Sequence, residues 1–141
     1  MVLNEKGIIK EFDLVIYPTH LIVVIGELSD KVHQLYKPDD PQYDSFLPPD
    51  DDHPCKTYTV LNKKDNGFDI MVWVKDLESC RGHYFCHEVG HVALEIFKYT
   101  GAIVDVENQE PFCYLLGNLY RLMAGAYDEL FEFKKKSKKK K

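Results

Sequence analysis

The 141-residue sequence lacks the features that would place it in a membrane or secreted class. No apolar run approaches the roughly 20 residues that are needed to span a bilayer. The first residues mix charged and apolar side chains and contain no hydrophobic stretch of the kind that signal peptides carry. We therefore expect a cytoplasmic protein with no membrane partner.

The chain lacks the paired cysteines that a common type of zinc site requires. The chain has four cysteines, and none of them forms a CxxC pair: Cys55, Cys80, Cys86 and Cys113. A zinc site built from cysteines is therefore not expected. Without an export signal, reduced thiols that pack as small hydrophobic side chains are the better interpretation.

The composition fits one globular domain with an unusual charge distribution. Hydrophobic residues make up 45% of the chain, and the formal net charge is −5. The last eight residues, KKKSKKKK, carry seven lysines, so removing those charges from −5 leaves −12 for residues 1–133. We expect a single acidic domain over 1–133 and a disordered lysine-rich tail over 134–141.

The tail suggests an electrostatic partner. Clustered lysines attract phosphate backbones with an affinity that depends on salt and ignores sequence. Weak, non-specific binding of nucleic acid, or of another acidic partner, is one expectation. The acidic body opposes general nucleic-acid binding, and a solvated tail that keeps the protein soluble is the alternative.

Hydrophobic patterns predict a small antiparallel or mixed sheet. Four segments rich in β-branched and aromatic residues are predicted strands: 8–17, 21–25, 57–61 and 68–75. The last two are expected to form a hairpin, because Asp65, Asn66 and Gly67 between them make a strong turn signal. A short helix is expected from Ser29 to Tyr36.

Two longer helices are predicted after the hairpin. The first covers 77–100, and its apolar residues recur at helical spacing: Phe85, Val89, Val92 and Ile96. The second begins near Glu110 and Pro111, since proline is favoured at the first helical position, and runs to about Phe133. These elements together predict an α+β fold in which the sheet packs on the two helices.

Residues 38–54 have no periodic pattern and contain five prolines and six aspartates. We expect a long surface loop, and long loops are often functional or mobile. A lid over the active site and a weak cation site are alternatives. The aspartates lack the spacing of an EF-hand, so a solvated loop is favoured.

The pattern that carries chemistry is His-Glu-Val-Gly-His at 87–91, in the middle of the first long helix. Side chains at i and i+4 lie on the same face of a helix, so His87 and His91 can bind one Zn²⁺. Glu88 between them is placed to reach the metal-bound water. The sequence therefore predicts a zinc site in which Glu88 is the general base.

A catalytic zinc site usually has three protein ligands, so a third is expected from another part of the chain. Glu110, at the start of the second helix, is the favoured candidate, with Glu107 as its competitor and Asp105 as a weaker choice. A helix N-terminal acid that is stabilised by the helix dipole is the alternative role of Glu110.

Two residues are candidates for stabilising the developing negative charge of the substrate: Tyr114, one turn beyond Glu110, and His83, one turn before His87. His83 and His91 are about 12 Å apart along the helix axis, too far to share one ion. His83 therefore supports the site from outside the ligand set at most, and either side chain can equally serve in packing.

These motifs resemble those of a known group. HEVGHVALEIFKYTG followed by NQEPFCYLLGNL resembles the zincin metallopeptidases whose third ligand is a glutamate, and more closely small zincin-like proteins of bacteriophages and prophages. There a similar helix is followed by a segment such as Glu-Ala-Tyr-Ala-Tyr-Leu, which matches Glu110, Phe112, Tyr114 and Leu115. The resemblance covers roughly 67–120, and a looser one links the chain to the ImmA/IrrE peptidases. Pro111, directly after the expected ligand, departs from the usual pattern.

The resemblance implies a zinc-dependent metallopeptidase in a bacterial or phage-infected cell, or associated with a virion. It also implies a sheet whose edge strand docks the substrate. The alternative is a non-catalytic zincin-fold module of a phage or prophage with a structural or interaction role. In that case the lysine tail would contact nucleic acid or an acidic partner.

Overall fold

A six-stranded mixed sheet forms the centre of the protein, in a computed structural model that describes residues 1–140. Its spatial order is β1-β2-β3-β6-β5-β4, and all neighbours are antiparallel except β3 and β6. The strands are β1 (Val2–Asn4), β2 (Gly7–Asp13), β3 (His20–Gly26), β4 (Tyr36–Pro38), β5 (Cys55–Asn62) and β6 (Phe68–Val74).

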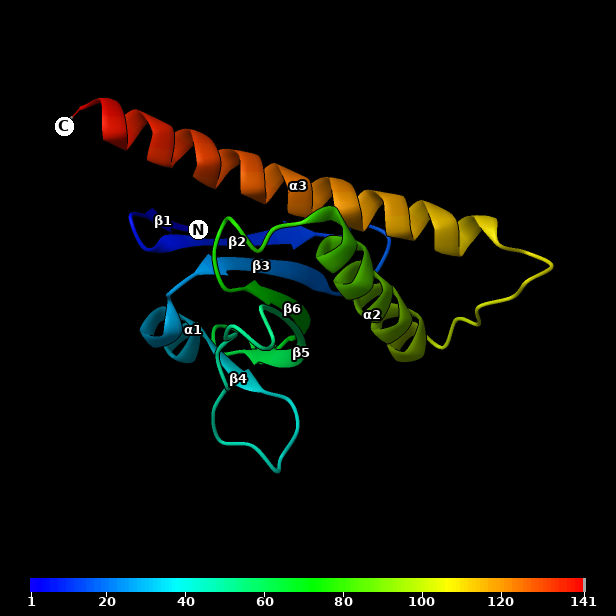
Figure 1. Cartoon of the computed structure of the whole chain (residues 1–141). Helices are drawn as coiled ribbons and strands as arrows, with labels where there is room; N and C mark the ends of the chain where they lie inside the picture. Colours follow the sequence, from blue (N-terminus) through cyan, green and yellow to red (C-terminus); the bar gives the residue numbers. More distant parts are fainter. Residues whose placement is uncertain (141) are drawn as a thin grey trace.

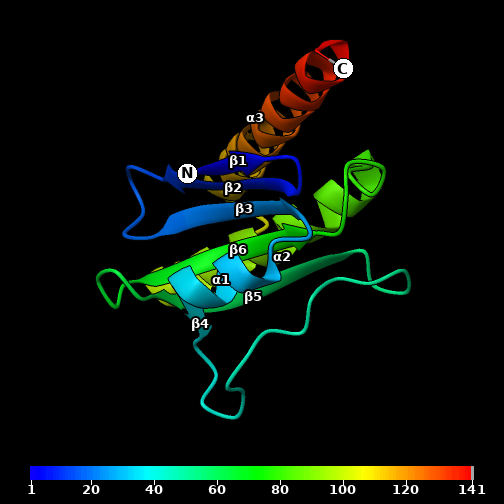
Figure 2. The same ribbon diagram turned by 90° about the vertical axis from the view of Figure 1, so that its left-hand side faces the viewer.

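Helices cover both faces of this sheet. The helix α2 (Gly82–Thr100) and the helix α3 (Glu110–Lys139) lie on one face, and the short helix α1 (Ser29–Leu35) lies on the other (Figures 1 and 2). The predicted α+β architecture, with a mixed sheet packed on two long helices, is confirmed. No helix in the described part of the chain is long and apolar enough to cross a membrane.

Strand β6 separates two hydrophobic cores. Alternate side chains on a strand point to opposite faces. Ile70, Val72 and Val74 pack toward α2 and α3, whereas Met71 and Trp73 pack toward α1. The side chains of the strand predicted over 68–75 therefore alternate between the two faces of the sheet. Burial on both faces also explains the continuous apolar run of β3, because a parallel pair at the centre of a sheet has no solvent-facing side.

The four predicted strands are present, with shifted ends. The strand predicted over 8–17 ends at Asp13, because the Asp13 carboxylate accepts a hydrogen bond from the N–H of Val15 (2.8 Å) and Val15 takes a φ of 62°. The turn signal before β6 is confirmed by Asn66, whose φ is 58°. Strands β1 and β4 were not predicted.

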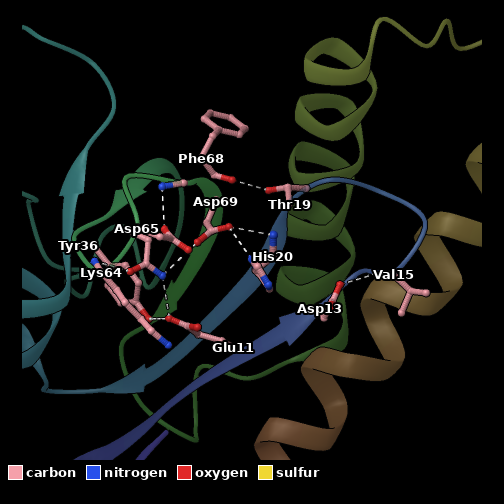
Figure 3. A network of polar contacts seen from close by, with 12 residues as sticks. Glu11, Asp13, Val15, Thr19, His20, Tyr36, Lys64, Asp65, Phe68 and Asp69 are labelled. Carbon is pink, nitrogen blue, oxygen red and sulfur yellow. Dashed lines mark hydrogen bonds and ion pairs between the residues drawn. The ribbon is translucent and has the colours of Figure 1, made fainter.

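A polar network joins five strands at one end of the α1 face (Figure 3). The hydroxyl of Tyr36 donates to Glu11 (2.6 Å), and Asn62 donates to both Glu11 (3.2 Å) and Asp69 (3.3 Å). Asp69, which is buried, also accepts a hydrogen bond from the backbone N–H of His20 (3.0 Å). Burial, together with the hydrogen bond to Glu11, raises the pKa of Tyr36. The network therefore links the edge strand β4 to the strands in the middle of the sheet.

Helix α2 begins at Gly82, five residues later than predicted. Asp76 accepts hydrogen bonds from the N–H (2.9 Å) and the hydroxyl (2.7 Å) of Ser79, which closes a turn in place of a first helical turn. The helix ends at Thr100, as predicted, and Gly101 follows in the left-handed conformation with a φ of 73°. The predicted apolar stripe is buried: Phe85, Val89, Val92 and Ile96.

Helix α3 runs to Lys139, beyond the predicted end at Phe133. Residues 134–139 are therefore helical rather than disordered, which corrects the expectation for this part of the tail. Lysine is a good helix former, and positive charge is favourable at a helix C-terminus. An ion pair between Lys10 and Glu129 (2.5 Å) fastens the helix to β2. Beyond that contact the helix rises away from the sheet (Figures 1 and 2).

The predicted loop at 38–54 starts in β4 and then crosses to β5. Phe46 anchors its middle on the α1 face: the ring is buried and lies 5.2 Å from the ring of Tyr58. The backbone N–H of Phe46 also donates to Nε2 of His33 (3.0 Å). The middle of the loop is therefore held on the face opposite to α2, and its last residues approach α2.

Candidate metal centre

His87 and His91 lie one turn apart on the exposed side of α2. Their Nε2 atoms are 3.1 Å apart, and the ring planes are inclined at 76°. Two nitrogens bound tetrahedrally to one zinc at about 2.0–2.1 Å would be roughly 3.3 Å apart. The pair therefore has the spacing and the chemistry of two ligands of one ion, as the HExxH spacing predicts.

Glu88, unlike the two exposed histidines, is buried against the sheet. It is 6% exposed, and its Oε2 accepts a hydrogen bond from the hydroxyl of Thr57 on β5. Cys55, two residues earlier on the same face of β5, also lies near this carboxylate. Burial, reinforced by Glu88 and Asp76, raises the pKa of the Cys55 thiol to about 12. The candidate base is thus held between α2 and the sheet, beside the histidine pair.

The strand that holds Glu88 has a free edge. Strand β4 pairs with only the last three residues of β5, Val60–Asn62. In the described part of the chain, no strand pairs with the outer edge of residues 55–58. An unpaired edge offers backbone donors and acceptors to another extended chain.

A groove of about 420 Å³ separates this edge from α2. Its lining combines β5 with the polar side of α2: Cys55, Lys56, Thr57, Tyr58, Thr59, Glu88, His91 and Glu95. Glu88 and His91 therefore line the same groove as the free edge of β5. The participation of Thr57 and Glu95 was not predicted, because their position depends on how β5 and α2 pack.

A second hollow of about 290 Å³ lies on the other side of Glu88. It brings His83 and His87 of α2 together with the end of the 38–54 loop, where Asp52 and His53 line it. The ring of His83 contacts the ring of Tyr84, with centroids 4.2 Å apart and the planes inclined at 38°. His83 is thus close to the site, as predicted. Asp52 and His53 were missed as site residues, although only Pro54 separates them from β5 in the sequence.

The acidic candidates for a third ligand lie apart from the histidines. Glu110 is the exposed first residue of α3, and Asp105 and Glu107 lie in the exposed connector, where Asp105 accepts a hydrogen bond from the N–H of Glu107 (2.9 Å). Over residues 1–140, no three His, Cys, Asp or Glu side chains are grouped so as to hold a metal. Tyr114 is 75% exposed and lines neither hollow.

The packing of α3 explains this separation. Phe112 of α3 contacts Phe97 of α2 (5.4 Å between ring centroids). At about 100° per residue, Phe97 lies roughly 80–120° around α2 from His87 and His91. The first turn of α3 is therefore docked on a different side of α2 from the histidine pair.

Comparison with protein-family models, with curated proteins and with solved structures found no match for this chain.

Proposed function

We propose that this protein is a zinc-dependent peptidase in which His87 and His91 hold the metal and Glu88 is the general base. The observation that carries the proposal is the 3.1 Å separation of the two Nε2 atoms beside a buried glutamate. Glu110 is the proposed third ligand, with Glu107 as the alternative. To reach the ion, Glu107 would need a change in the connector between α2 and α3, and Glu110 would need a change in the first turn of α3 as well.

The remaining groups have defined roles in this proposal. When bound, zinc acidifies water and polarises the carbonyl of the peptide bond. Glu88 takes the proton of the attacking water and passes it to the leaving amine. The Thr57 hydroxyl orients the Glu88 carboxylate for this transfer. The free edge of β5 aligns the substrate as an added strand beside the site.

His83 and Tyr114 were both candidates for stabilising the charge that develops on the carbonyl oxygen. His83 shares a hollow with His87 and Glu88, whereas Tyr114 is exposed on α3. We therefore propose His83 for this role ahead of Tyr114.

Zinc content and peptide hydrolysis test the proposal together. We expect one zinc per chain in the purified protein, loss of zinc in His87→Ala, and retention of zinc in His83→Ala, which removes a histidine one turn away on the same helix. Glu88→Gln should keep the metal and lose hydrolysis. Zinc that stays bound in His87→Ala, or full activity in Glu88→Gln, would contradict the proposal.

The lysine-bearing end of α3 supports a second candidate function, an interaction module that contacts nucleic acid or an acidic partner. Lysines 135, 136, 138 and 139 are exposed on the part of α3 that leaves the sheet (Figure 2). Phosphate contacts of this kind weaken steeply with salt. Duplex DNA binding that falls with salt and disappears on deletion of 134–141 would support it. Binding that survives the deletion would refute it.

A further inference from the structure

The groove between β5 and α2 has carboxylates, and no lysine or arginine, on the side that α2 contributes within the described residues. Two carboxylates line it, those of Glu88 and Glu95. Apart from His91, which the proposed function assigns to the metal, Lys56 is the one basic residue in the lining within the described 1–140. Its ammonium donates to the backbone oxygens of Leu47 (3.4 Å) and Pro48 (3.2 Å), which belong to the 38–54 loop. The lysine charge is therefore held away from the α2 side of the groove.

The two carboxylates differ in how they are used. Glu88 is buried and accepts the hydroxyl of Thr57. Glu95 is half-buried, and none of the hydrogen bonds or ion pairs found within residues 1–140 involves it. A carboxylate that is partly removed from water and has no partner favours a positive group from outside.

Glu95 is not placed to be a metal ligand. It lies eight residues after His87, or about 12 Å along the helix axis, too far for one ion to be shared by both residues and His91. It lies about 6 Å beyond His91, one helical turn. An extended peptide advances about 6.7 Å in two residues, and its side chains return to the same face at that interval.

We propose that Glu95 is a specificity-determining residue that selects a lysine or arginine about two residues from the bond to be cleaved. The selected side chain points toward α2 while the peptide backbone pairs with residues 55–58 of β5. This inference rests on the proposed peptidase function. The basic side chain gains a charge-assisted hydrogen bond to Glu95, whereas a neutral or acidic side chain leaves that carboxylate unpaired or repelled.

Peptide affinity tests the inference without requiring turnover. The zinc-loaded full chain carrying Glu88→Gln would be titrated with a set of nine-residue peptides that differ only in the position of one lysine. We expect one position at which lysine binds about fivefold more tightly than glutamine, the upper end of the range for an exposed charge pair. Adding Glu95→Gln should reduce the ratio below about twofold, and 1 M salt should reduce it as well.

A matched control keeps the test specific. Glu27→Gln removes the same charge from the exposed turn before α1, on the opposite face of the sheet, and should leave the preference unchanged. The inference would be overturned if the preference for lysine survived Glu95→Gln. It would also be overturned if no peptide position preferred lysine, or if no peptide bound. Loss of zinc in Glu95→Gln would also overturn it, by making Glu95 a ligand. A Glu95-dependent preference without hydrolysis by the wild-type protein would refute the peptidase alone.

Discussion

The contact between Thr57 and Glu88 gives the most quantitative prediction. Thr57→Val replaces the hydroxyl by a methyl group and leaves a carboxylate that is 6% exposed without its hydrogen-bond donor. A hydrogen bond to a charged group contributes about 1.5–3 kcal/mol. The unfolding entropy of a 141-residue chain is about 0.3 kcal/mol/K, from about 2.1 cal/mol/K per residue. The melting temperature should therefore fall by about 5–10 °C.

Thermal unfolding at pH 7, followed by circular dichroism, would measure this change. Thr59→Val is the matched control, because Thr59 lies two residues further on the same face of β5 and its hydroxyl makes no hydrogen bond within the described residues. A double-mutant cycle with Glu88→Gln should give a coupling of about 1–3 kcal/mol between Thr57 and Glu88. Equal melting temperatures for the Thr57 and Thr59 variants would refute the argument that Thr57 holds the candidate base.

Two further predictions follow from burial. Burial raises the pKa of the Cys55 and Cys80 thiols to about 12, so both stay protonated at pH 8 and should react slowly with iodoacetamide. The exposed Cys86 and Cys113 should react within minutes. Mass spectrometry of the labelled peptides measures the difference, and equal labelling of all four thiols would contradict the prediction. Phe46→Ala removes the buried ring that anchors the 38–54 loop, so the free energy of unfolding measured by urea titration should fall by about 3 kcal/mol. The loop should also be cut faster by proteases. An unchanged midpoint of the urea transition would show that the anchor is not needed.

The parts of the fold that were predicted correctly depend on local patterns. The strands predicted at 21–25 and 68–75 and the turn at Asn66 each follow from residues that are adjacent in sequence. Strand β4 was missed because the burial of Tyr36 comes from partners that are distant in sequence, Glu11 and Asn62. The late start of α2 was missed because Asp76, directly before the predicted helix, closes a separate turn with Ser79.

The same division applies to the candidate site. His87, Glu88 and His91 lie on one helix, so their geometry follows from helical periodicity and was predicted. Thr57 and the groove beside Glu95 depend on how β5 packs against α2, which no local pattern specifies. Glu110 as the third ligand remains a prediction, because the docking of α3 places it away from the two histidines.

The zinc K-edge X-ray absorption spectrum of the purified protein tests the central claim most directly. The account predicts scattering from two imidazole nitrogens at about 2.0–2.1 Å and from oxygen ligands only in the remaining positions. In His87→Ala the imidazole contribution should disappear along with the bound metal. A sulfur ligand at about 2.3 Å, or a spectrum without imidazole scattering, would contradict the assignment of His87 and His91 as the metal-binding pair.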